Sequence, residues 1–129
     1  MLDIEGVHTY YGESHVLHGV SLRVGQGEAV ALLGRNGAGK TTLIRSIMGF
    51  TPPREGQILL DGEQIHNWPA HRIARGGLAL VPQGRRIFAP LSVRENLLLG
   101  ARSAGWTLDR VFELFPRLRE RATQAGGTL

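Results

Sequence analysis

The stretch Gly34-Arg35-Asn36-Gly37-Ala38-Gly39-Lys40-Thr41 decides how this sequence folds, because it follows the pattern G-x-x-x-x-G-K-[ST]. Glycines in this pattern let the backbone turn tightly and direct its N–H groups inward, where they can surround phosphate. A largely apolar run, residues 28–33, precedes the stretch, and apolar residues at helical spacing follow it. A strand, a phosphate-binding loop and a helix are therefore predicted in that order.

The loop residues have distinct predicted roles toward ATP, the nucleotide that the motif indicates. Lys40 brings a mobile charge to the β- and γ-phosphates, and the Thr41 hydroxyl is placed to bind Mg²⁺. The positive end of the following helix adds to the attraction for phosphate, and Thr42 is a further candidate for contact with the α-phosphate. We expect ATP and Mg²⁺ to be held by Gly34, Asn36, Gly37, Ala38, Gly39, Lys40, Thr41 and Thr42.

The motif alone does not name a function, because kinases, GTPases, helicases and transport ATPases share it. A Rossmann-type dinucleotide site is disfavoured, since Gly37 and Gly39 are followed by Lys40-Thr41 and not by the spacing G-x-G-x-x-G. A chain of 129 residues, with 42% hydrophobic and 20% charged residues, is typical of one globular domain or part of one.

Composition also excludes several classes of protein. The absence of cysteine rules out disulfides and thiolate metal sites, and the longest apolar runs are far too short to span a bilayer. The net charge of +4 comes from basic residues interspersed with acidic ones. This pattern favours a solvated surface over a nucleic-acid-binding block.

Short alternating or apolar stretches predict the strands. They are residues 2–4, 20–24, 28–33, 58–65 and 78–81. Residues 10–14 are expected to be a loop, and Asp61-Gly62 is typical of a hairpin turn. The stretches 28–33 and 78–81 are expected to be buried parallel strands.

Capping signals and prolines predict the helices. One helix is expected between Lys40 and Gly49, and a shorter one from Pro69 to residue 76 or 77. The capping box Ser92-Val93-Arg94-Glu95 predicts a helix over residues 93–101, and Thr107 caps a further segment that Pro116 interrupts. This order of elements is an α/β pattern with an antiparallel annex.

Several more motifs stand in register with the phosphate loop. They are Tyr11-Gly12, residues 16–22, Gly25-Gln26-Gly27-Glu28, Pro53-Arg54-Glu55-Gly56-Gln57-Ile58, Asp61-Gly62, residues 81–88 and residues 91–97. With them the whole chain resembles the nucleotide-binding subunit of an ABC transporter. The resemblance implies the N-terminal half of a P-loop NTPase of the ABC ATPase type, with an antiparallel β annex, a parallel-sheet core with the Walker A helix, and the start of the helical subdomain.

The resemblance assigns roles to two residues outside the loop. Tyr11 matches the aromatic residue that stacks on adenine. Gln83 matches the glutamine that touches Mg²⁺, positions the attacking water and contacts the transmembrane partner. Arg85 and Arg86 beside it are candidates for binding acidic groups of a partner or phosphates, with a solvated loop as the alternative.

Within the family, residues 82–88 and 113–118 resemble importers of branched-chain amino acids, and relatives that import urea or short amides look similar. The resemblance implies transmembrane permease subunits and a second ATP-binding subunit as partners, in a homo- or heterodimer. It also implies a cytoplasmic location, peripheral on the inner face of the cell membrane, and no nucleic acid as a partner. The solute is chosen by other subunits.

One departure from the family concerns the end of the sequence at Leu129, where a Leu-Ser-Gly-Gly signature is expected to start. We expect residues 1–129 to be a partial ATP-binding domain truncated just before that motif, without the Walker B strand, its catalytic glutamate and the switch histidine. Weak nucleotide binding and negligible hydrolysis are expected of this chain alone. The alternatives are a soluble ABC-type ATPase of a nucleic-acid machine and a non-catalytic truncated fragment.

Two histidines, His15 and His18, stand three residues apart near the start of the chain. A metal site would need more ligands, and none cluster nearby in the sequence. We expect surface or partly packed histidines.

Overall fold

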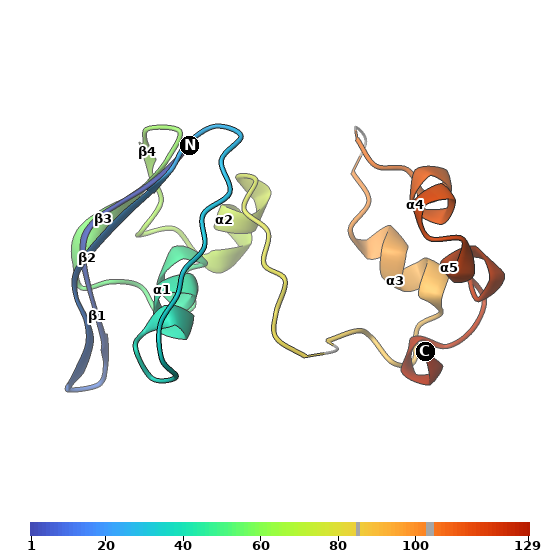
Figure 1. The fold of residues 1–129 in the computed structure, drawn as a ribbon, viewed down its shortest axis with the longest axis horizontal. Helices are drawn as coiled ribbons and strands as arrows, with labels where there is room; N and C mark the ends of the chain where they lie inside the picture. The colour runs from blue at the N-terminus through green and yellow to red at the C-terminus, as the bar shows by residue number, and fades with distance from the viewer. Residues whose placement is uncertain (85, 103–104) are drawn as a thin grey trace. The chain divides into compact units, whose positions relative to one another are not determined.

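The computed structural model describes residues 1–84, 86–102 and 105–129. Its ribbon is drawn in Figure 1. The chain divides into two compact units, Met1–Leu80 and Val81–Leu129, and each is described by itself.

The first unit is built on an antiparallel sheet with the strand order β2-β1-β3-β4. Its strands are β1 (Leu2–Tyr11), β2 (Ser14–Val24), β3 (Glu55–Leu60) and β4 (Glu63–Gln64). Along β1, Ile4 and Val7 are buried, and Ile4 pairs with the buried Ile58 of β3. Alternating apolar residues therefore give this sheet one face that packs against the core.

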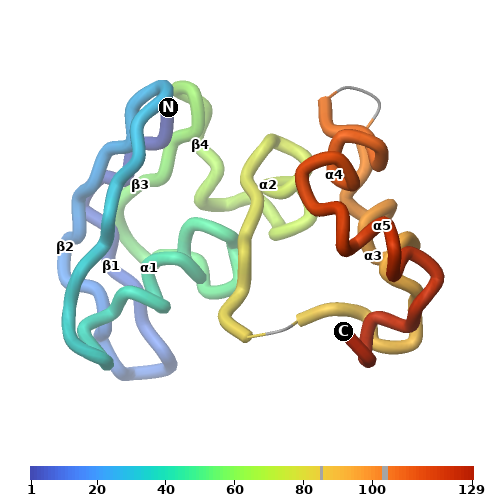
Figure 2. The backbone as a smooth tube through the Cα atoms, turned by 45° about the vertical axis from the view of Figure 1, so that its right-hand side comes forward, coloured from blue at the N-terminus to red at the C-terminus, as the bar shows by residue number. Residues whose placement is uncertain are grey.

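Two helices cover that face of the sheet: α1 (Lys40–Ile47) and α2 (Ala70–Arg75). Figure 2 shows both on the same side of the strands. The core cluster of the unit consists of Ile4, Val7, Leu17, Leu43, Ile47, Ile58, Ile65 and Ile73. One buried polar contact crosses it, since the hydroxyls of Thr9 and Ser46 lie 2.8 Å apart and so link β1 to α1.

The turns of the sheet confirm one expectation and correct another. Asp61 and Gly62, with φ of 49° and 83°, join β3 to β4 as the Asp-Gly signal predicts. The prediction of a loop over residues 10–14 was wrong, because β1 continues through Tyr11 and β2 begins at Ser14. Gly12, with φ of 57°, lets the chain reverse within residues 12–13.

The stretches 28–33 and 78–81, expected to be parallel strands, carry no regular secondary structure. A strand exists through its ladder of hydrogen bonds to a neighbour, and neither stretch has such a ladder among the described residues. Most of their apolar side chains are exposed as a result, with Leu33 at 88% and Val81 at 93%, whereas Leu78 is half-buried against the core. The sheet of the described chain is thus its antiparallel part.

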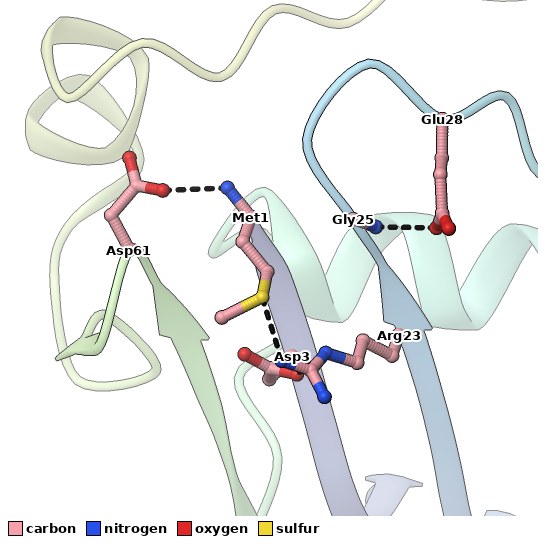
Figure 3. Close-up of polar contacts among 6 residues, drawn as sticks. All are labelled: Met1, Asp3, Arg23, Gly25, Glu28 and Asp61. Carbon is pink, nitrogen blue, oxygen red and sulfur yellow. Dashed lines mark hydrogen bonds and ion pairs between the residues drawn. The ribbon is translucent and has the colours of Figure 1, made fainter.

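Polar contacts tie together the ends of three strands (Figure 3). The Met1 amine donates to Asp61 at 2.5 Å, and Arg23 Nε lies 3.1 Å from Asp3 Oδ1. Beyond β2, the backbone N–H of Gly25 donates to the Glu28 carboxylate at 2.7 Å. The contacts of Met1 and Asp3 hold β1 at one end between β2 and the turn that follows β3.

The second unit is helical, with α3 (Val93–Leu99), α4 (Leu108–Leu114), α5 (Pro116–Glu120) and a 3₁₀ turn at Gly126–Thr128. Ser92 and Glu95 form the predicted capping box, and Thr107 caps α4 through the Arg110 N–H. Pro116 starts α5, as the missing proline N–H allows. Local sequence signals therefore place the starts of all three helices.

Asn96 of α3 organises the loop before its own helix. Its amide donates to the carbonyls of Phe88, Leu91 and Ser92 at 3.0–3.2 Å, and its oxygen accepts the Phe88 N–H at 2.9 Å. The Leu91 carbonyl also accepts the Gly126 N–H at 2.7 Å. The Asn96 side chain thus joins the loop to the helix, and the Leu91 carbonyl links the loop to the last turn of this unit.

Candidate functional site

The predicted phosphate-binding loop leads directly into α1, as its pattern requires. The Ala38 N–H donates to the Arg35 carbonyl at 3.1 Å, which closes a tight turn. Gly37 and Gly39 have φ of 82° and 95°, which side chains rarely allow. Gly39 is buried, and a Cβ on it would lie 2.8 Å from Leu17 Cδ2. Glycine at position 39 is therefore required by backbone conformation and by space.

The Lys40 side chain bends back over this loop. Its ammonium donates to the Gly34 carbonyl and, at 3.0 Å, to the Arg35 carbonyl. The charge is thereby held over the turn, where the N-terminal end of α1 adds a positive partial charge. The structure brings together the two sources of positive potential that the sequence predicts for a phosphate site.

The two threonines after Lys40 differ in their surroundings. Thr41 is exposed, so that its hydroxyl is open to a ligand. Thr42 is buried, and its hydroxyl donates to the Tyr11 hydroxyl at 3.4 Å. The Thr42 carbonyl accepts from Ser46 at 2.8 Å. Thr41 is thus the better placed of the two for binding a metal ion.

Tyr11 ends β1 and reaches across to α1. It is 44% exposed, so part of its ring is open to a stacking partner. The hydrogen bond from Thr42 is the main cause that lowers the pKa of Tyr11. Burial opposes it, and weaker contacts with Thr51 and Arg45 lower the pKa further. The structure therefore brings the predicted adenine-stacking residue next to the phosphate loop and its helix.

The polar surroundings of Tyr11 were missed by sequence reasoning. Arg45 lies one turn along α1 from Thr42, and its Nε donates to Thr51 at 3.2 Å. No motif covers these residues, and only the packing of β1 on α1 brings them near the tyrosine. The other loop residues, Gly34, Asn36, Gly37 and Ala38, are exposed.

Gln83 belongs to the second unit, whereas the phosphate loop belongs to the first. It is exposed, and its carbonyl accepts from Arg86 Nε at 3.4 Å. Arg85 lies outside the described residues. A hollow of about 510 Å³ in the second unit is lined by Val81, Pro82, Gly84, Arg86, Ile87 and Leu129, without Gln83.

The comparison with protein families decides the identity of this fold. A family model described as ABC transporter matches residues 17–128, which include the phosphate loop, α1 and Gln83. The chain belongs to the ABC transporter family. This membership confirms the P-loop NTPase fold of the ABC ATPase type that the motifs predicted.

Relatives of this ABC transporter chain include importers and exporters. BraG of Pseudomonas aeruginosa, a high-affinity branched-chain amino acid transport ATP-binding protein, is 43% identical over 100% of this chain and 58% of its own length. The Nod factor export ATP-binding protein I of a Rhizobium species is 38% identical over 94% of this chain and 39% of its own length. The chain therefore spans well under two thirds of either relative.

A solved structure supports the same fold. The crystal structure of a nucleotide-free ATP-binding cassette from an ABC transporter superposes with a TM-score of 0.79 at 26% identity, over 100% of this chain and 58% of that one. Among the residues that our structure describes, no helix has the length and hydropathy needed to cross a membrane.

Proposed function

We propose that this chain binds ATP with Mg²⁺ at the loop from Gly34 to Thr41. The observation that carries the proposal is the position of the Lys40 ammonium, held over the turn at the N-terminal end of α1. Tyr11 supports adenine stacking, because its partly exposed ring lies beside α1. The exposed Thr41 hydroxyl supports a role as ligand of Mg²⁺.

Titration with a fluorescent ATP analogue tests the loop. Lys40→Ala is expected to weaken binding by about ten- to a hundredfold, the value of one or two hydrogen bonds from a charged group. Arg75→Ala, which removes a positive charge from the end of α2, serves as the matched control and is expected to leave binding unchanged. Equal binding by wild type and Lys40→Ala contradicts the proposed site.

Thr41→Val tests the metal separately, because valine keeps the shape of threonine and removes its hydroxyl. We expect this variant to bind metal-free ATP as the wild type does, and to lose the gain in affinity that Mg²⁺ gives. Thr42→Val is the control for a neighbouring hydroxyl and is expected to keep the response to Mg²⁺. If Mg²⁺ raises the ATP affinity of Thr41→Val as much as that of the wild type, Thr41 is not a ligand of Mg²⁺.

In the whole protein, we propose that ATP hydrolysis powers the uptake of branched-chain amino acids or related small solutes. Higher identity and full coverage of this chain favour BraG over the export protein as the guide. Transmembrane permease subunits and a second ATP-binding subunit are the proposed partners. Gln83 is the proposed contact to Mg²⁺ and the attacking water. The proposed location is the inner face of the cell membrane, with this subunit in the cytoplasm.

Uptake of labelled leucine tests this transport function in cells that produce the whole protein with its permeases. We expect uptake above that of cells lacking the subunit, and loss of that uptake with Lys40→Ala. Leucine leaving preloaded cells in an ATP-dependent manner would point to export. If cells with the whole protein take up no more leucine than cells lacking the subunit, while the protein still binds ATP, branched-chain amino acids are not the cargo. The proposed nucleotide site is then unaffected.

A further inference from the structure

A group of aromatic rings lies on the sheet face opposite the core. His8 and Tyr10 flank Thr9, whose hydroxyl points into the core, so both project from the other side of β1. His15 of β2 is the register partner of Tyr10, and their rings stack with centroids 4.2 Å apart. Nδ1 of His8 and Nε2 of His15 lie 3.0 Å apart.

The two imidazoles are held in place by their neighbours. Pairing of Tyr10 with His15 ties His15 to β1 two residues beyond His8, next to irregularities in the register on either side of Thr9. The His18 ring packs on His15 at a centroid distance of 3.8 Å. On the other side, His8 Nε2 would lie 3.3 Å from a Cβ at Gly19, so the glycine makes room for the ring. The pair is thus ordered by its surroundings before any ligand binds.

The separation of the two nitrogens suits a metal ion as well as a shared proton. Between neutral imidazoles, one ring nitrogen must donate and the other accept. An ion at the usual Zn–N distance of about 2.0–2.1 Å from both rings needs the nitrogens about 3.4 Å apart in tetrahedral geometry. To bind an ion, the two nitrogens must separate by about 0.4 Å and turn from each other toward the metal. We propose that His8 and His15 form a two-imidazole site for a transition-metal ion such as Cu²⁺, Ni²⁺ or Zn²⁺.

The charges around the pair set limits on its affinity. Arg54 lies over the Tyr10 ring at 4.3 Å and disfavours a cation nearby, whereas Glu55, the register partner of His8, favours one. Among the residues that the structure describes, no three histidine, cysteine or acidic side chains are grouped to hold a metal. The site therefore takes two protein ligands and leaves positions open to water or to a small ligand, unlike a closed structural zinc site.

This site differs in chemistry from the Mg²⁺ site proposed at Thr41. Imidazole nitrogen prefers copper, nickel and zinc, whereas Mg²⁺ prefers oxygen. The expected order of affinity places Cu²⁺ above Ni²⁺ and Zn²⁺.

Calorimetric titration of the nucleotide-free protein with Cu²⁺, and separately with Zn²⁺, tests the site. We expect one saturable site and a Cu²⁺ absorption band of nitrogen ligation. Each of His8→Gln and His15→Gln is expected to weaken binding at least about tenfold, since loss of even an indirect partner of a metal ligand costs that much.

The matched control is His71→Gln, which removes an exposed histidine from α2. It is expected to bind Cu²⁺ within about twofold of wild type, and Mg²⁺ is expected to give no signal in any variant. Circular dichroism of His8→Gln and His15→Gln checks that the sheet has formed. No saturable binding by the wild type, or an equal loss with His71→Gln, overturns the proposal.

Discussion

Gly37 and Gly39 share a left-handed backbone conformation but differ in what surrounds them. A Cβ at Gly37 meets nothing within 4 Å, whereas one at Gly39 lies 2.8 Å from Leu17 Cδ2. We expect Gly37→Ala to cost about 1–2 kcal/mol of stability, the strain of this conformation alone. Gly39→Ala is expected to cost more, because Leu17 belongs to the core and must move.

Urea denaturation of the two variants checks this difference. Both substitutions add one methyl group two residues apart in the same loop, so each is the control for the other. Equal urea midpoints for the two variants would show that Leu17 moves without a loss of stability. Backbone strain alone would then explain the effect of both substitutions.

Tyr11 provides a prediction in the alkaline range. The hydrogen bond from Thr42 contributes most to lowering the pKa of Tyr11 below its ordinary value of 10.0. Ionised Tyr11 therefore stabilises the fold at pH above about 10, and this contribution is lost as the pH falls through the folded pKa. At neutral pH the tyrosine is un-ionised in both states, and no effect is expected.

Tyrosinate absorbance measures this pKa directly. The chain has two tyrosines, so Tyr10→Phe leaves Tyr11 as the single signal. In that background we expect Thr42→Val to move the titration of Tyr11 upward, toward 10.0. Ser46→Ala, which removes a hydroxyl one turn along α1, is expected to leave it in place. If Thr42→Val leaves the pKa of Tyr11 unchanged, the result contradicts the hydrogen bond between Thr42 and Tyr11.

At the scale of single elements, Asn96 gives the sharpest expectation. Asn96→Ala leaves three carbonyls and one N–H of residues 88–92 without this partner. The carbonyls keep the backbone N–H groups of Leu91, Gly126 and Asn96 as partners, so the Phe88 N–H is the group left unpaired. We expect a loss of about 1–3 kcal/mol, the cost of leaving one donor unpaired. Ser92→Ala, which removes only the helix cap, is expected to cost about 1 kcal/mol.

Thermal unfolding of the two variants checks this order, and helix content from circular dichroism shows whether α3 persists. A larger loss of stability with Ser92→Ala than with Asn96→Ala would show that the helix cap stabilises this unit more than the Asn96 contacts do. Gly126→Ala is a second probe of the same junction, because a Cβ there lies 2.9 Å from the Asn96 amide nitrogen.

The elements that sequence could predict are those specified by neighbouring residues. The capping box at Ser92, the Asp61-Gly62 turn and the helix after Gly39 each depend on a few adjacent side chains, and all three are present. A strand at 28–33 or 78–81 would need a hydrogen-bonded neighbour, which no local pattern specifies and which the described residues do not contain. Most apolar side chains of the two stretches are therefore exposed, contrary to the prediction.

The candidate site also has residues that local sequence predicts and contacts that only the packing of distant segments determines. The spacing of the phosphate loop predicted Lys40 and Thr41, because glycine conformation and helix start are local. The contacts of Lys40 with the Gly34 and Arg35 carbonyls, and those of Tyr11 with Thr42, depend on how the loop and β1 pack on α1. No pattern in the sequence specifies that packing.

For the whole molecule, the exposed apolar residues of 29–33 predict self-association. Val30, Leu32 and Leu33 are 45%, 40% and 88% exposed on a stretch whose backbone has no ladder among the described residues. Such edges favour pairing between chains. We expect Leu33→Gln to lower the share of oligomers seen by light scattering at high protein concentration.

Leu114→Gln is the matched control, since Leu114 is 59% exposed but lies in the helix α4. It is expected to change the oligomer share less than Leu33→Gln does. If the two substitutions have equal effects, association depends on total exposed apolar area and not on the unpaired stretch.

The position of the Lys40 side chain also bears on the heat of nucleotide binding. Phosphate oxygens must replace the Gly34 and Arg35 carbonyls as partners of the ammonium, so that binding is an exchange of ligands. The enthalpy gained from phosphate is reduced by the bonds given up. In return, the side chain has already lost part of its rotamer entropy, about 2 kcal/mol for a free lysine. We therefore expect calorimetry to show modest heat release with a small entropic penalty.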